Sequence, residues 1–148
     1  MRIVIDLQGA QTESRFRGVG RYTLSIAKAM CREADGHEII LLLNSALPDA
    51  IPYLRAEFAD LVPPDNFVVF NGLSQSRRQR PENQWRHDAG ALLREAFIAG
   101  LEADAVFIPG FFEGYVDDAT VSASRLFPVP VIATLHDLIP LLNAERYL

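Results

Sequence analysis

Five short apolar runs recur along this chain, at residues 2–7, 38–43, 67–70, 105–109 and 131–135, and they constrain its fold more than any other feature. Val, Ile, Leu and Phe dominate them, without the alternation of apolar and polar residues that marks a half-exposed strand. Such runs are typical of strands buried on both faces of a parallel sheet. Because segments with helical spacing separate the first four runs, the chain is predicted to form a doubly wound, mainly parallel α/β sheet.

Helices are expected at residues 20–34, 48–61 and 85–101, and polar loops at 8–18 and 71–84. Apolar residues recur every three or four positions in each helix, which predicts the face that packs on the sheet. These residues are Tyr22, Ile26, Ala27, Met30 and Cys31 in the first helix, Ile51, Leu54 and Phe58 in the second, and Leu92, Leu93, Ala96 and Phe97 in the third. A strand order of 3-2-1-4-5 would then let the loops that begin at Gln8 and Gly110 border one ligand crevice.

The composition fits one folded domain, with 148 residues of which 49% are hydrophobic. The net charge of −5 gives no reason to expect a nucleic-acid partner. Cys31 is the single cysteine, which excludes an internal disulfide, and its helical context predicts a buried structural thiol. No signal peptide is visible, and no apolar run approaches the roughly 20 residues that span a bilayer, so a cytoplasmic location is expected. Contact with a membrane surface stays open.

A glycine pair stands at the start of the first helix, in the segment Gly18, Val19, Gly20 and Arg21. Glycine lets a ligand approach the backbone closely, and a helix N-terminus offers free amides to a phosphate. The alternative is a glycine pair that only turns the chain. Because Thr23 replaces the third glycine of the dinucleotide fingerprint, a nicotinamide cofactor is disfavoured.

His136 and Asp137 directly follow the fifth apolar run. A histidine at the carboxyl end of a strand can donate to a sugar hydroxyl or transfer a proton, and the aspartate can fix its tautomer. The alternative is that Asp137 caps the next turn and His136 is a satisfied polar residue. No second histidine has metal-ligand spacing, so no metal site is expected.

Two further loops contain candidate acceptor-binding residues. Phe111, Phe112 and Tyr115 lie on a glycine-flanked loop, where aromatic rings can stack on sugars or pack beneath the loop or against another domain. Arg77 and Arg78 lie in a basic segment, which is either a solvated loop or a docking surface for a phosphorylated lipid or an anionic glycan acceptor.

Taken together, these motifs give the whole chain a resemblance to the N-terminal domain of retaining GT-B glycosyltransferases, the group-1 or family-4 class. The resemblance rests on the start Met1–Asp6, the segment Gly18–Tyr22 and the segment Thr134–Pro140. It is strongest to transferases that build bacterial surface polysaccharides, often mannosyltransferases. It implies a cytoplasmic two-domain enzyme whose Rossmann-like N-terminal half binds a glycan or lipid-linked acceptor, in the latter case at the inner face of the membrane. The resemblance further implies that a C-terminal half binds the nucleotide-sugar donor.

The resemblance also implies roles for single residues. Gly18 and Gly20 would approach the donor diphosphate or sugar across the cleft, and His136 would bind the donor sugar near the reacting carbon. Transfer would retain configuration, with no cofactor beyond the sugar nucleotide and no obligatory metal. The family's Glu-x7-Glu signature belongs to the C-terminal half, and no glutamate here has another eight positions on. Residues 1–148 are therefore expected to be one domain of a longer enzyme, inactive by itself.

A second interpretation is a non-catalytic Rossmann-like or flavodoxin-like module that binds a phosphorylated ligand. A response-regulator-like domain is disfavoured, because Asp6 is followed by Leu7 and lacks the acidic neighbour of that class.

Overall fold

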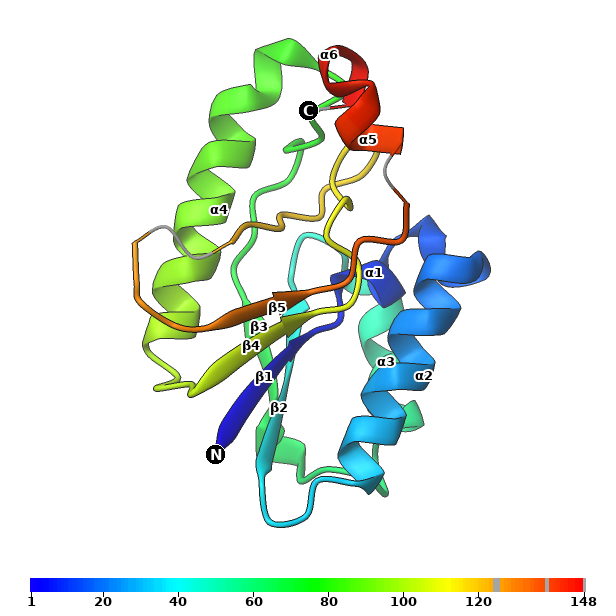
Figure 1. Cartoon of the computed structure of the whole chain (residues 1–148), viewed down its shortest axis with the longest axis vertical. Helices are drawn as coiled ribbons and strands as arrows, with labels where there is room; N and C mark the ends of the chain where they lie inside the picture. Colours follow the sequence, from blue (N-terminus) through cyan, green and yellow to red (C-terminus); the bar gives the residue numbers. More distant parts are fainter. Residues whose placement is uncertain (124–125, 138, 148) are drawn as a thin grey trace.

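Within residues 1–123, 126–137 and 139–147, which the computed structural model describes, five strands form one parallel sheet in the order β3-β2-β1-β4-β5 (Figure 1). The strands are β1 (Arg2–Asp6), β2 (Glu38–Asn44), β3 (Phe67–Phe70), β4 (Ala105–Ile108) and β5 (Val131–Ala133). At the centre of the sheet, Ile5 pairs with Leu41 on one side and with Phe107 on the other. The predicted strand order is confirmed, and the topological switch lies between β1 and β4.

Helices cover both faces of this sheet. The long helix α2 (Gly18–Arg32) and α3 (Ile51–Glu57) lie on one face, and α4 (Gln84–Ala99) lies on the other (Figure 1). The shorter elements are α1 (Gln8–Gln11), α5 (Ile139–Leu142), α6 (Ala144–Tyr147) and the 3-10 turns η1 (Glu13–Phe16), η2 (Pro48–Ala50), η3 (Pro64–Asn66) and η4 (Pro81–Asn83). The chain therefore has the predicted doubly wound, Rossmann-like α/β fold. No helix in the described part of the chain has the length and apolar character needed to cross a membrane.

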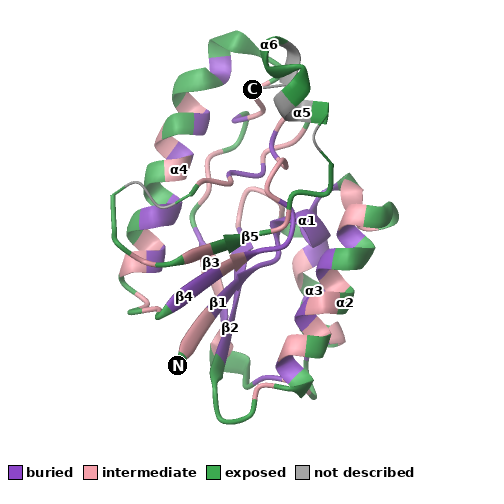
Figure 2. Ribbon diagram, in the orientation of Figure 1, coloured by how far each residue is buried: buried purple, intermediate pink, exposed green. Residues whose placement is uncertain are grey.

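Alternate residues of the central strands enter two separate cores, and the strands are mostly buried (Figure 2). Ile5 and Leu41 pack with Phe58 on the side of α2 and α3. Val4 and Leu42 pack on the side of α4. Burying one such side chain contributes about 1.5–3 kcal/mol, so a sheet covered on both faces requires unbroken apolar runs.

The buried stripe of α2 differs in part from the predicted one. Its buried residues are Gly20, Thr23, Ala27 and Cys31. Tyr22 is 38% exposed, and with Ile26 and Met30 it lines an apolar groove beside β4 and β5. The small residues face inward because α2 packs closely on the preceding turns. The prediction is confirmed for Ala27 and Cys31, and burial raises the pKa of the Cys31 thiol to about 11.

The prediction for the inner face of α4 was wrong for Leu92, Leu93 and Ala96, whereas Phe97 packs against the core as predicted. Of the residues expected inside, Leu92, Leu93 and Ala96 are exposed and Phe97 is partly buried. Arg94 and Glu95 are buried instead, at 1% and 3% exposure. They point inward because each has a polar partner near the carboxyl edge of the sheet, Asp6 for Arg94 and Ser122 for Glu95.

The connection after β1, predicted as a polar loop, contains α1 and η1. The Thr12 side chain caps η1 by accepting a hydrogen bond from Ser14 N at 3.1 Å. The strand β5 lies at an edge of the sheet and is shorter than the apolar run at 131–135. Ile132 is 61% exposed because, among the described strands, β5 pairs with β4 alone. The connection after β1 is thus a structured element of the candidate site.

Candidate functional site

The segments that leave β4 and β5 lie side by side at the carboxyl edge of the sheet. Phe111 N donates to Thr134 O at 3.4 Å. The hydroxyl groups of Tyr22 and Thr134 are hydrogen-bonded at 3.3 Å, which brings α2 to the same place. The motifs that the sequence placed at this edge are therefore neighbours in space.

A buried ion pair links the elements that form this edge of the sheet. Arg94 Nη2 lies 2.7 Å from Asp6 Oδ2, and Arg94 Nε donates to the same oxygen at 2.8 Å. Gln8 N donates to Asp6 Oδ1 at 2.9 Å, so both carboxylate oxygens have partners. Arg94 Nη1 reaches on to the Ser122 carbonyl at 3.3 Å. The pair thus joins the end of β1, helix α4 and the long loop after β4.

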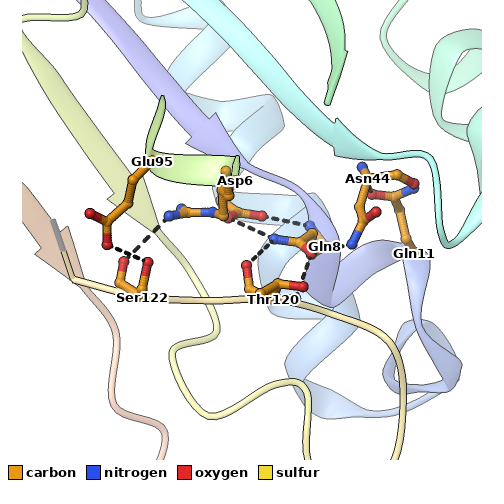
Figure 3. A network of polar contacts seen from close by, with 8 residues as sticks. Asp6, Gln8, Gln11, Asn44, Glu95, Thr120 and Ser122 are labelled. Carbon is orange, nitrogen blue, oxygen red and sulfur yellow. Dashed lines mark hydrogen bonds and ion pairs between the residues drawn. The ribbon is translucent and has the colours of Figure 1, made fainter. Parts of the chain in front are cut away.

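A network of amide side chains continues from Asp6 to the end of β2 (Figure 3). Gln8 Nε2 donates to Thr120 O at 2.9 Å, and Gln8 Oε1 accepts from Thr120 N at 2.8 Å. Asn44 Nδ2 donates to the same Gln8 oxygen at 2.8 Å, and Gln11 Nε2 donates to Asn44 O at 3.0 Å. The side-chain amides of Gln8, Gln11 and Asn44 are all paired, and paired buried groups rigidify their surroundings, so this network holds the loop after β4 in place.

The two glycines at the start of α2 have different environments. A Cβ at Gly20 would lie 2.3 Å from Arg15 Cα and 2.4 Å from Ser14 O, so this glycine lets α2 pack against η1. A Cβ at Gly18 would meet nothing within 4 Å, and Gly18 and Arg21 are exposed while Val19 is partly buried. The close approach at Gly20 is made within the chain, and Gly18 is the glycine open to a ligand. Donor binding at this helix start stays a prediction.

His136 and Asp137 both have partners in the chain. His136 Nε2 lies 2.8 Å from Pro109 O, and since a carbonyl only accepts, Nε2 is the donor and Nδ1 is left as the other ring nitrogen. The Tyr22 ring meets the His136 ring edge-on at 4.9 Å between centroids. Asp137 Oδ1 accepts from Ile139 N at 2.9 Å, which is the capping contact weighed as the alternative role. His136 is exposed at the carboxyl edge, and its ligand role stays a prediction.

A cavity of about 540 Å³ lies between α4 and the loop after β4. Phe111 and Phe112 line it, with their ring centroids 5.8 Å apart. Arg78 and His87 line it too, and among the described residues Arg78 Nε and His87 Nδ1 are buried without a hydrogen-bond partner. Burial and the nearby Arg78 lower the pKa of His87, and burial lowers the pKa of Arg78. Phe111, Phe112 and Arg78, predicted to bind an acceptor, are thus brought to one cavity.

Arg77 and Tyr115 lie beside the cavity but do not line it. Arg77 Nε lies 3.8 Å from Asp118 Oδ1. The backbone of Gln79 donates to Tyr115 O at 2.8 Å, so the basic segment is tied to the loop after β4. The cavity itself also contains the carboxylates of Asp88 and Glu95, which balance the basic residues.

Sequence reasoning missed Glu113, a partly buried carboxyl between the loops after β1 and β4. Its Oε2 accepts hydrogen bonds from Thr12 Oγ1 and Ser14 Oγ, both at 3.2 Å. Burial, together with the charge of Asp117, raises the pKa of Glu113 to about 7. Its place between Gly110 and Gly114, on the loop that follows β4, was the available signal.

His87 was also missed as a cavity residue, because the apolar periodicity of α4 was assigned to the wrong face. Its seven-residue spacing from the buried Arg94 places both on one side of the helix. Among the described residues, no group of three or more His, Cys, Asp or Glu side chains is arranged to hold a metal ion.

Comparison with known proteins finds three relatives in Escherichia coli, each named serotype-specific mannosyltransferase WbdA. One is 37% identical over 150 residues, which cover 100% of this chain and 18% of that protein. The others are 33% and 30% identical over 125 residues, which cover 83% of this chain and 15% of each protein. The chain therefore spans less than a fifth of the length of the curated relatives it matches. No protein-family model and no solved structure matches it.

Proposed function

We propose that this chain is the acceptor-binding, N-terminal domain of a retaining GT-B mannosyltransferase, which moves mannose from a nucleotide sugar to a polysaccharide or a lipid-linked glycan. The relatives named mannosyltransferase support the reaction class. The proposal that this chain binds the acceptor rests on the cavity that Phe111 and Phe112 line. In this proposal the nucleotide of the donor is bound by a second domain facing the carboxyl edge of the sheet.

The cavity has the chemistry of a saccharide site. Its volume of about 540 Å³ lies in the range of small-ligand pockets. The rings of Phe111 and Phe112 offer apolar faces to the C–H groups of a sugar. His87 Nδ1 and Arg78 Nε have no partner within the described residues, and an unsatisfied buried polar atom costs about 1–3 kcal/mol. Because both side chains line the cavity, a ligand that carries hydroxyl groups suits it better than an apolar one.

In this proposal the donor binds on the side of the loop after β4 that is opposite the cavity. The open N-terminus of α2 at Gly18, with Arg21 beside it, offers backbone amides and positive charge to a diphosphate. His136 Nδ1 accepts a hydrogen bond from a hydroxyl of the donor sugar. These roles extend the resemblance of the motifs to family-4 transferases.

The reaction in this proposal is a transfer with retained configuration. The oxygen of the acceptor hydroxyl forms a bond to the anomeric carbon as the bond from that carbon to the diphosphate oxygen breaks. The diphosphate leaves with the electron pair of that bond and takes up the proton of the hydroxyl group. Basic residues of the second domain neutralise the leaving group, and no metal is obligatory. The enzyme acts in the cytoplasm, at the inner face of the membrane when the acceptor is lipid-linked.

The test is an NMR titration of the isotope-labelled chain with α-linked mannobiose and, separately, with inorganic phosphate. Mannobiose is expected to shift the resonances of His87, Phe111 and Phe112. Phe112→Ala should weaken binding at least about tenfold, which corresponds to roughly 1.4 kcal/mol of lost stacking. Phe16→Ala is the matched control, because Phe16 is 69% exposed and lies outside the cavity.

Two results would contradict the proposal. Binding of phosphate without binding of mannobiose would support the non-catalytic module for a phosphorylated ligand. Micromolar affinity of the chain alone for a nucleotide sugar would contradict the division of labour between two domains.

A further inference from the structure

The side chain of Glu113 turns away from the acceptor cavity and joins two loops that border the topological switch. Thr12 and Ser14, which follow β1, both donate to Glu113 Oε2 at 3.2 Å. Thr12 Oγ1 itself accepts from Ser14 N, so its hydrogen is free to be donated to the carboxyl group. Glu113 is thus fixed through one oxygen only.

Two glycines lie beside the side chain of Glu113. A Cβ at Gly9 would lie 3.8 Å from Glu113 Cγ, and a Cβ at Gly110 would lie 3.4 Å from the same atom. A Cβ at Gly110 would also lie 3.2 Å from Val19 Cγ1, at the start of α2. The carboxyl group therefore sits beside the helix start that the sequence predicts to approach a donor.

The second oxygen, Oε1, has no hydrogen-bond partner among the described residues and is not closed off from solvent. Because Oε2 accepts two hydrogen bonds, a proton on Glu113 is carried by Oε1. Oε1 is therefore a donor in the acid form and an acceptor in the ionised form. A hydroxyl group can pair with either form, since it both donates and accepts.

The charges around Glu113 favour a neutral ligand at Oε1. Burial and Asp117 raise the pKa of Glu113 to about 7, the hydroxyls of Ser14 and Thr12 lower it, and Asp6 of β1 raises it further. The negative charge of Asp6 is balanced by Arg94. Asp117 is itself a partly buried carboxyl group, and this burial raises its pKa. A phosphate would face these carboxyl groups, so a sugar hydroxyl suits Oε1 better than an anion.

We propose that Glu113 is a ligand-binding residue of this site, whose Oε1 hydrogen-bonds a hydroxyl group of the sugar that the enzyme transfers or extends. The inference rests on the proposed function, because that function supplies the sugar. It adds a polar contact on the side of the loop opposite Phe111 and Phe112. It also makes sugar binding depend on the proton of one carboxyl group.

The test follows the Glu113 carboxyl resonance by NMR between pH 5 and 9, with and without methyl α-D-mannopyranoside. Without sugar, the Glu113 carboxyl group should titrate near pH 7. Addition of the sugar should shift the Glu113 resonance and lower the pH at the midpoint of its titration. Affinity should rise about fivefold from pH 6 to pH 8, because hydrogen bonds to an ionised acceptor are the stronger ones. Glu113→Gln keeps the shape but cannot ionise, so its affinity should be independent of pH.

Glu82→Gln is the matched control, because Glu82 is exposed on η4 and lines none of the cavities described here. It should leave the affinity and its pH dependence unchanged. Sugar-induced shifts at Phe111 and Phe112 with an unperturbed Glu113, or an unchanged pH profile in Glu113→Gln, would overturn this inference and leave the proposed function standing. The absence of any sugar-induced shift in the chain would overturn both.

Discussion

The buried ion pair between Asp6 and Arg94 gives the sharpest prediction for stability. Asp6 is 2% exposed and Arg94 is 1% exposed, and Arg94 is the basic partner of that carboxylate, through two nitrogens within 2.8 Å. Arg94→Met removes the positive charge at similar length and leaves the carboxylate buried. Removing one partner of a buried pair costs about 3–5 kcal/mol, against a total stability of about 5–15 kcal/mol for a typical domain.

The assay is urea unfolding at pH 7, followed by circular dichroism. Arg32→Met is the matched control, because Arg32 is exposed on α2 and its loss should change the free energy of unfolding by less than about 0.5 kcal/mol. The double variant Asp6→Asn/Arg94→Met should recover more than half of the loss, since it removes both charges. If Arg94→Met does not fold, Arg94→Lys keeps the charge and should fold with a smaller loss.

A loss below about 1 kcal/mol for Arg94→Met would refute the reasoning, because a solvated pair contributes no more than that. A double variant as unstable as the single one would also refute it. In that case the packing of the Arg94 side chain, and not the uncompensated charge of Asp6, would account for the loss.

Two further predictions concern the loop after β1 and its partner Glu113. Gly20→Ala should lower the free energy of unfolding by about 1–3 kcal/mol, because the new Cβ would lie 2.3 Å from Arg15 Cα. Gly18→Ala should be neutral or stabilising, because a Cβ at Gly18 would meet nothing within 4 Å. Thermal melts of the two variants distinguish these outcomes. The raised pKa of Glu113 means that the folded state holds its proton more tightly than the unfolded state. The free energy of unfolding should therefore fall by up to about 3 kcal/mol as pH rises from about 4.5 to about 7. Urea titrations across that range should show that Glu113→Gln lacks this part of the pH dependence. An unchanged slope of the free energy of unfolding against pH in the variant would contradict the prediction.

The candidate site was predictable in outline but not in its polar partners. Gly18, His136 and Phe111 could be placed at one edge, because every strand-to-helix connection of a parallel sheet leaves from the same end. Glu113 could not be given its role, since its partner Thr12 lies 101 residues away and no local pattern reports that contact. His87 was hidden because apolar spacing alone oriented α4.

What the sequence by itself determined is the sheet. Strands buried on both faces need unbroken apolar runs, and the runs at β1 to β5 together with right-handed crossovers leave few possible orders. What only the tertiary structure decided is which side of each helix faces inward. In α4, Leu92 and Leu93 are exposed and Arg94 faces inward, because Asp6, 88 residues earlier, offers a buried charge that must be paired. Long-range electrostatic pairing of this kind outweighs local hydrophobic pattern, and it depends on contacts that form only when the sheet is assembled.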